Sequence, residues 1–251
     1  MPARLFMIHG SHPCATVEKA FALKGLPFKR IEVVASTQPL VMRLLFGGRT
    51  VPGVKFADGA KVQGSRAILR ALEDRVPSPP LYAGPAGASA IAEAERWGDE
   101  VFQQIPRRLL WAGFTKHPGA MHAFQEGQRS PKLPKPVVLA ASRLVLPIER
   151  RINDVDDAGV RADLAALPLL LDQVDQYIAD GVLNGAQPNA ADLQIAPTIR
   201  LLYALEDLRP LIDGRPAEAF AFRWFDRPGA TVPTGALPVE AAAQAATLPA
   251  G

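Results

Sequence analysis

The order of strand-like and helix-like stretches in the first 75 residues constrains the fold more than any other feature of this sequence. Short apolar or β-branched runs predict strands at residues 4–8, 29–34, 50–56 and 60–62. Apolar residues at helical spacing predict helices at residues 13–24, 38–46 and 65–73. Pro13 suits the first turn of a helix, and Asp58-Gly59 is a hairpin signal between the last two strands. The order β-α-β-α-β-β-α predicts a small α/β domain over residues 1–76.

The rest of the chain has a different pattern. Four prolines and a glycine indicate a linker at residues 77–85, and an all-α helical-bundle domain is predicted over residues 86–227. Its helices are expected at residues 91–114, 137–153, 158–179, 189–205 and 218–225. The loop-like residues 117–136 could cover a pocket. Residues 228–251 are rich in Ala, Pro, Thr and Gly without a period, which predicts a flexible tail.

Composition excludes several classes of protein. Lys and Arg total 28 against 25 Asp and Glu, and no basic stripe with interleaved aromatics occurs, so no nucleic acid partner is expected. The chain has one cysteine, which excludes an intrachain disulfide and a zinc site built on cysteines, and its four histidines form no HExxH pattern. We therefore expect no metal. The sequence shows no secretory signal and no apolar run of about 20 residues, so we expect a cytoplasmic protein without a membrane partner.

Four short motifs occur one after another along these predicted strands and helices. They are Ser11-His12-Pro13-Cys14 and Gln63-Gly64-Ser65-Arg66-Ala67-Ile68 at strand-to-helix turns, Thr50-Val51-Pro52 at a strand start, and Pro188-Asn189-Ala190-Ala191-Asp192-Leu193 at a helix start. In this order the sequence resembles the glutathione transferase superfamily, and in particular its bacterial Ser/Cys-type members, over residues 3–225. The resemblance implies a thioredoxin-like domain followed by an all-helical domain. It also implies a dimeric detoxification enzyme that conjugates glutathione, its co-substrate, to an electrophilic apolar molecule.

Ser11 and Cys14 are the candidate catalytic residues. A helix N-terminus presents unpaired N–H groups and a partial positive charge, which favour a thiolate. The resemblance implies that Ser11 stabilises the thiolate of bound glutathione, although Ser11 could equally be a plain helix N-cap. Cys14 shares a helical stripe with Val17 and Phe21, which favours a buried core thiol. The alternative is a reactive thiol that would make the protein a thiol–disulfide reductase or deglutathionylase.

The resemblance also implies a set of glutathione-binding residues. They are His12, Pro13, Thr50, Val51, Pro52, Gln63, Gly64 and Ser65. Val51-Pro52 would be a cis step whose backbone pairs with the cysteinyl part of the peptide, and Ser65 would hold the γ-glutamyl carboxylate. Gly64 replaces the usual Glu or Gln, and Thr50 replaces a frequent Lys. A different low-molecular-weight thiol, or a non-catalytic binding protein, therefore stays open. His12 is either a ligand contact or a surface histidine.

Two further groups are interpreted from the helical half. The resemblance implies that the aromatic side chains of Phe102, Trp111 and Phe114 line the pocket for the electrophile, whereas aromatics at helical spacing are also typical of a core. Arg107 and Arg108 are expected on a solvated helix face. Asn189 and Asp192 have the spacing of a capping box, and we assign them to folding.

Overall fold

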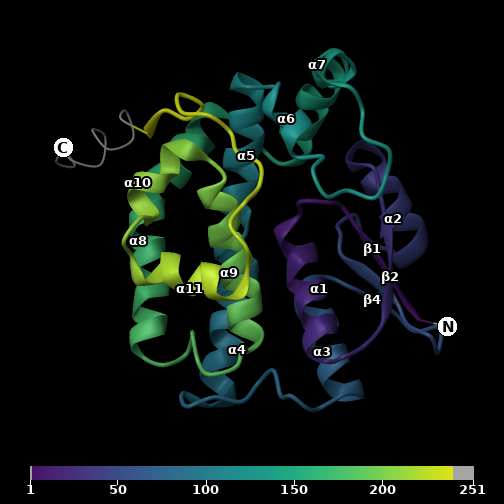
Figure 1. Ribbon diagram of the computed structural model, residues 1–251, viewed down its shortest axis with the longest axis vertical. Helices are drawn as coiled ribbons and strands as arrows, with labels where there is room; N and C mark the ends of the chain where they lie inside the picture. The colour runs from purple at the N-terminus through teal and green to yellow at the C-terminus, as the bar shows by residue number, and fades with distance from the viewer. Residues whose placement is uncertain (1, 240–251) are drawn as a thin grey trace.

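The computed structural model describes residues 2–239 and contains an α/β domain followed by an all-helical domain, as expected (Figure 1). The α/β domain consists of β1 (Ala3–Met7), α1 (His12–Leu23), β2 (Phe28–Glu32), the 3₁₀ turn η1 (Ala35–Thr37), α2 (Gln38–Phe46), β3 (Gly53–Lys55), β4 (Lys61–Gln63) and α3 (Ser65–Arg75). The sheet order is β2-β1-β3-β4. β1 and β2 are parallel, and β3 is antiparallel to both β1 and β4. This mixed sheet is the thioredoxin-like arrangement that the sequence predicts.

Local sequence signals explain the helix ends in this domain. α1 has Pro13 in its first turn and buries Cys14, Val17 and Phe21 against the sheet. Gly25 follows α1 and Gly47 follows α2, both with positive φ, a backbone conformation that favours glycine.

The helical domain is built around α9, which is buried on nearly every side. Its elements are α4 (Gly87–Trp97), the π-helical turn η2 (Gly98–Phe102), α5 (Gln104–Lys116), α6 (Ala120–Ala123), α7 (Lys135–Ile152), α8 (Asp157–Ala179), α9 (Ala190–Tyr203), η3 (Glu206–Leu208), α10 (Arg209–Ile212) and α11 (Pro216–Trp224). α9 packs on α1, α4 and α11, and Figure 1 shows it near the middle of the molecule. Within residues 2–239, no helix is both long enough and apolar enough to cross a membrane.

The capping box at the start of α9 forms as predicted. The Asn189 side chain accepts a hydrogen bond from the Asp192 N–H at 3.0 Å, and the Asp192 carboxylate accepts from the Asn189 N–H at 2.7 Å. Asn189 also donates to the Val182 carbonyl at 2.8 Å. Both side chains are buried, so the box fixes the central helix from inside the domain.

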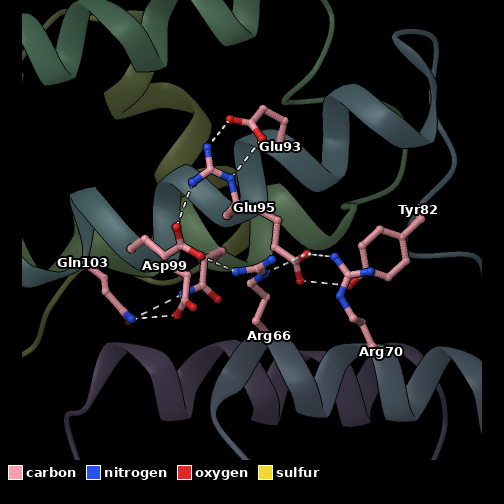
Figure 2. Close-up of polar contacts among 10 residues, drawn as sticks. Arg66, Arg70, Tyr82, Glu93, Glu95, Asp99 and Gln103 are labelled. Atoms are coloured by element: carbon pink, nitrogen blue, oxygen red, sulfur yellow. Dashed lines mark hydrogen bonds and ion pairs between the residues drawn. The ribbon is translucent and has the colours of Figure 1, made fainter.

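A buried carboxylate joins the two domains. Glu95 on α4 is fully buried and accepts hydrogen bonds from the Tyr82 hydroxyl at 2.8 Å and from Arg70 at 3.0 Å. Figure 2 shows Arg66 and Arg70 reaching from α3 toward this carboxylate. Burial raises the pKa of Glu95 to about 7. The two arginines therefore hold α3 of the first domain against α4 of the second.

The structure corrects two predictions about the helical half. The helix expected at residues 91–114 is divided by η2, where Gly98 lets α9 approach so closely that a Cβ would lie 2.9 Å from Ile195. The flexible tail predicted for residues 228–251 is wrong for residues 228–239. Val232 is fully buried and forms a β-bridge with Leu205. The remainder of that predicted tail, residues 240–251, lies outside the described residues.

Apolar contacts and one carboxylate hold this C-terminal segment in place. Ala236 and Leu237 are buried with Val232 against the helices. The Asp207 carboxylate accepts hydrogen bonds from the N–H groups of Gly235, Ala236 and Leu237 at 2.7–2.8 Å. A segment without a periodic pattern therefore completes the core of the helical domain.

Candidate active site

A cleft of about 1130 Å³ lies between the α/β domain and the helical domain. One wall is the turn from Ile8 to Pro13 together with Thr50 and Val51. The opposite wall is the face of α5 that carries Arg107, Leu110, Trp111 and Phe114. The loop at residues 117–136 contributes a third wall through Met121, Phe124, Gln125, Gln128, Ser130, Pro131 and Leu133. This loop therefore borders the cleft.

Ser11 lies at the N-terminus of α1 and borders the cleft. Its backbone carbonyl accepts from the N–H groups of Cys14 at 3.1 Å and Ala15 at 3.0 Å, which starts the helix. Its side chain makes no capping hydrogen bond to the helix backbone. Ser11 is therefore the N-cap residue of α1 by position, but the stabilising side-chain bond of the plain-cap interpretation does not form. A half-buried hydroxyl at the positive end of the α1 helix dipole is suited to donating to an anion.

Cys14 is a buried core thiol. It has no exposed surface, and burial raises its pKa to about 12, an effect that a hydrogen bond with Ser11 only partly offsets. A thiol with this pKa is almost entirely protonated at neutral pH. The structure thus gives no support to Cys14 as a nucleophile.

His12 is buried rather than on the surface, so the interpretation as a surface histidine is wrong. Its ring lies under the helical domain, where Nε2 donates to the Gln103 carbonyl at 3.2 Å. Burial, and then the positive charge of Arg107, lower its pKa to about 3, so the ring is neutral. His12 and Pro13 form the floor of the cleft at the start of α1, where His12 is an uncharged wall.

The Val51-Pro52 peptide bond is cis, as the resemblance implies. Among residues 2–239, the backbone N–H and C=O of Val51 have no hydrogen-bond partner. The Pro52 carbonyl accepts from the Gly64 N–H at 2.9 Å, which ties this corner to the start of α3. Val51 therefore offers one free backbone donor and one free acceptor beside the cleft, the pattern required for pairing with an extended peptide.

Gln63, Gly64 and Ser65 have separate roles at the edge of β4. The Gln63 side chain accepts from the Gly48 N–H at 3.0 Å and donates to the Thr50 carbonyl at 2.6 Å, so it braces the loop before Val51. Gly64 has a φ of +90°, which an L side chain rarely adopts. The Ser65 hydroxyl is buried at the N-terminus of α3 and has no partner among the described residues. An orphaned hydroxyl at a helix N-terminus fits a ligand carboxylate.

The sequence-predicted residues therefore fall into three groups. The cleft brings together Ser11, His12, Pro13, Thr50, Val51, Trp111 and Phe114. Pro52, Gln63, Gly64 and Ser65 adjoin it at the edge of β3 and β4. Phe102 is the exception, because it is fully buried and stacked on Trp97 with ring centroids 5.2 Å apart. Its assignment to the substrate pocket is wrong, since α9 covers the side of η2 that carries it.

Sequence reasoning missed Arg107 as a cleft residue. Its side chain borders the cleft, contacts Gln104 at 3.3 Å and has a pKa lowered by burial. The sequence does contain a signal for this position: Arg107, Trp111 and Phe114 are spaced i, i+4, i+7 and so share one helix face. Arg108, in contrast, points to α8, where it pairs with Asp163 at 2.8 Å.

Among the charged side chains that line the cleft, the carboxylates are already hydrogen-bonded within the protein, whereas a cation lacks a carboxylate partner within residues 2–239. Glu32 is occupied by the N–H groups of Arg129 and Ser130 at 2.9–3.0 Å. Glu149 is buried and accepts from Asn153. Arg107 has no carboxylate partner within hydrogen-bond distance in the described chain. The cleft is therefore apolar with an available cation.

Comparison with known proteins supports a glutathione transferase-like fold. Residues 5–80 match the sequence family described as "Glutathione S-transferase, N-terminal domain". No match is found among curated proteins. Solved structures at 16–18% identity cover nearly the whole chain, which shows a shared fold, and the Ser/Cys-type subclass stays a prediction.

Three of these structures illustrate the range. A glutathione transferase from Populus trichocarpa has a TM-score of 0.60 and 16% identity, covering 98% of this chain and 99% of that chain. The beta-etherase of a Sphingobium strain has a TM-score of 0.59 and 15% identity, covering 89% and 99%. A theta class glutathione S-transferase from Xanthomonas axonopodis pv. citri, solved with glutathione bound, has a TM-score of 0.58 and 18% identity, covering 91% and 95%.

Proposed function

We propose that this protein is a glutathione transferase-like enzyme that joins a low-molecular-weight thiol, glutathione, to an electrophilic apolar molecule. The observation that carries the proposal is the position of Ser11. Its side chain borders an apolar cleft at the N-terminus of α1 and makes no capping bond to that helix. The N-terminal family match and the glutathione-bound theta class structure of similar fold support the choice of thiol.

The reaction needs a thiolate near neutral pH. The Ser11 hydroxyl and the N-terminus of α1 favour the anion of the bound thiol, whose proton leaves to solvent. The sulfur then forms a bond to the electrophilic carbon, and the leaving group departs with the electron pair of the broken bond. No oxidant or reductant enters this step. Cys14, which is buried and protonated, takes no part in it.

The remaining residues would hold the two substrates. The free backbone groups of Val51 pair with the cysteinyl part of the thiol peptide, and the orphaned Ser65 hydroxyl donates a hydrogen bond to its γ-glutamyl carboxylate. Gln63 acts indirectly, by bracing the loop that carries Thr50 and Val51. Trp111 and Phe114 form the apolar surface for the electrophile, next to Arg107.

Steady-state kinetics of Ser11→Ala test the proposal. With glutathione and chlorodinitrobenzene, we expect kcat/KM to fall by about 10²–10³, the usual cost of losing one donor to a developing or stabilised anion. The pH profile should also move to higher pH, because the thiol pKa rises without the donor. Ser36→Ala, an exposed serine in η1, is the matched control and should change nothing. Equal activity of Ser11→Ala and the unaltered protein would overturn the proposal.

A non-catalytic binding protein with the same fold is the second candidate, and two observations favour it. Gly64 has no side chain to grip a ligand, and the Gln63 side chain is already occupied. A rise in melting temperature on adding glutathione distinguishes a protein that binds glutathione from one that does not. With a Kd of about 0.1 mM, 1 mM glutathione adds about 1.4 kcal/mol, or about 3–6 °C in Tm. A shift without turnover would favour the second candidate.

The expected homodimer and cytoplasmic location are part of this proposal. In the superfamily, the α/β domain of one subunit packs against the helices of the other. Light scattering after size exclusion gives the mass directly, and a value near 54 kDa, twice the chain mass of 26.9 kDa, is expected.

A further inference from the structure

Exposed apolar side chains are concentrated on two segments of the described chain. Nine of its eleven exposed large hydrophobic residues lie within residues 34–44 and 133–152. They are Val34, Leu40, Leu44, Leu133, Val137, Leu139, Leu144, Ile148 and Ile152, and we call them the α2–α7 surface. Leu44 and Leu144 are the most exposed, at 76% and 75%. Exposed apolar side chains that form a contiguous patch mark an interaction site.

The two segments are neighbours in the fold. α7 contacts η1, the turn that leads into α2, and Figure 1 shows α2 and α7 on the side of the molecule away from α8. On α7, residues 137, 144, 148 and 152 form an exposed stripe, while Val138, Ser142, Leu146 and Glu149 form the buried one. α7 therefore has two apolar faces, of which only one is used inside the molecule.

The charge of these two segments is mostly positive. Residues 33–50 and 129–152 contain eight Lys or Arg residues and one acidic residue, Glu149, although the whole chain has nearly equal numbers of both. The basic residues are Arg43, Arg49, Arg129, Lys132, Lys135, Arg143, Arg150 and Arg151. Glu149 is buried. Across residues 2–239, only Lys132 of the eight has a carboxylate partner, Glu126.

We propose that the α2–α7 surface binds the surface of an anionic lipid bilayer. Apolar side chains that project beside basic ones suit this partner, because the former enter the headgroup region while the latter contact acidic lipids. A second copy of the chain fits worse, since a two-fold dimer would place these unpaired cations against the same cations. The sequence alone gives no membrane partner, because the surface exists only once two distant segments are folded together.

The position of the α2–α7 surface beside the cleft would make membrane binding useful to the enzyme, an argument that rests on the proposed function. Val34, Leu133 and Ile152 belong to the α2–α7 surface and also line the cleft. The mouth of the cleft therefore opens at the surface that would face the lipid. An apolar electrophile dissolved in a bilayer could enter beside Trp111 without first crossing water.

Vesicle co-sedimentation of the full chain tests the proposal directly. We expect binding to phosphatidylcholine vesicles that contain phosphatidylglycerol, weaker binding at high salt, and little binding to phosphatidylcholine alone. Leu144→Glu should lower the partition coefficient by about tenfold. Leu169→Glu on α8, where the leucine is 73% exposed, is the matched control and should change it by less than about twofold.

A second pair of variants tests the electrostatic part. Arg143→Gln should weaken binding by about fivefold. Arg161→Gln, an exposed arginine on α8, should leave it unchanged. Circular dichroism confirms that each variant is folded, and light scattering of Leu144→Glu detects any change of oligomeric state.

Three outcomes would overturn the proposal. They are no binding to anionic vesicles, equal losses for Leu144→Glu and Leu169→Glu, or a dimer that Leu144→Glu converts to a monomer, which would make the surface an interface between copies. None of these readouts uses transferase activity, so failure of the proposed function leaves the vesicle result independent.

Discussion

The burial of Cys14 can be measured with a thiol-labelling reagent, because the chain has no other cysteine. Burial raises the pKa of this thiol from 9.0 to about 12, so at any pH below both values the thiolate fraction falls by about a thousandfold. Steric exclusion adds to this, since the side chain has no exposed surface. We therefore expect Ellman's reagent to label the folded protein at least about a thousandfold more slowly than the protein unfolded in guanidinium chloride.

Cys14→Ala provides the control for this experiment. It should show no labelling in either state, and its free energy of unfolding should be lower by about 1–2 kcal/mol because a small cavity replaces the sulfur. Its transferase activity should match that of the unaltered protein. A folded-state labelling rate within about tenfold of the unfolded rate would refute the buried thiol and restore the thiol–disulfide reductase as a candidate.

Three further predictions concern stability and specificity. Asn189→Ala removes one side of the capping box and the bond to Val182, so the free energy of unfolding in urea should fall by about 2–3 kcal/mol; an unchanged midpoint would contradict this. The folded protein holds the His12 pKa at about 3, so between about pH 3 and 6.5 the unfolded chain binds one more proton at this site. Stability is therefore lost as the pH falls through this window, and His12→Gln should reduce the slope by about 1.4 kcal/mol per pH unit, whereas parallel profiles would refute it. Arg107→Gln should raise KM about tenfold for an electrophile with a carboxylate and leave a neutral analogue nearly unchanged, and equal effects on both would contradict a cationic role.

Local signals in the sequence predicted much of the α/β domain. Pro13 and Gly25 mark the ends of α1 to within about two residues, and Asp58-Gly59 lies at the turn between β3 and β4. The capping box was predicted for the same reason, since its two members, Asn189 and Asp192, are three residues apart. Each of these features depends on contacts between residues that are close in sequence.

The misassigned residues depend on contacts between elements that are not adjacent in the chain. His12 is buried because Gln103 lies over it, 91 residues away, and Phe102 faces the core because η2 turns the helix beneath α9. A π-helical turn has no period that a hydrophobic pattern would show. The cleft role of Arg107 follows from the same packing. The order of the motifs was enough to predict the fold. Which side chains are exposed could be determined only from the packed helices.

The packing of residues 228–239 also determines which of the two domains can complete its core first while the chain is being synthesised. Val232 and Leu237 complete a core whose other members lie on helices made earlier. The ribosome releases the β1–α3 unit first, and that unit contains all four paired strands of its sheet. The helical half must wait for nearly the last residues described, so Leu205 stays uncovered on the nascent chain until they emerge. A chain that ends at Arg227 would therefore lack the strand partner that covers Leu205 in the folded protein.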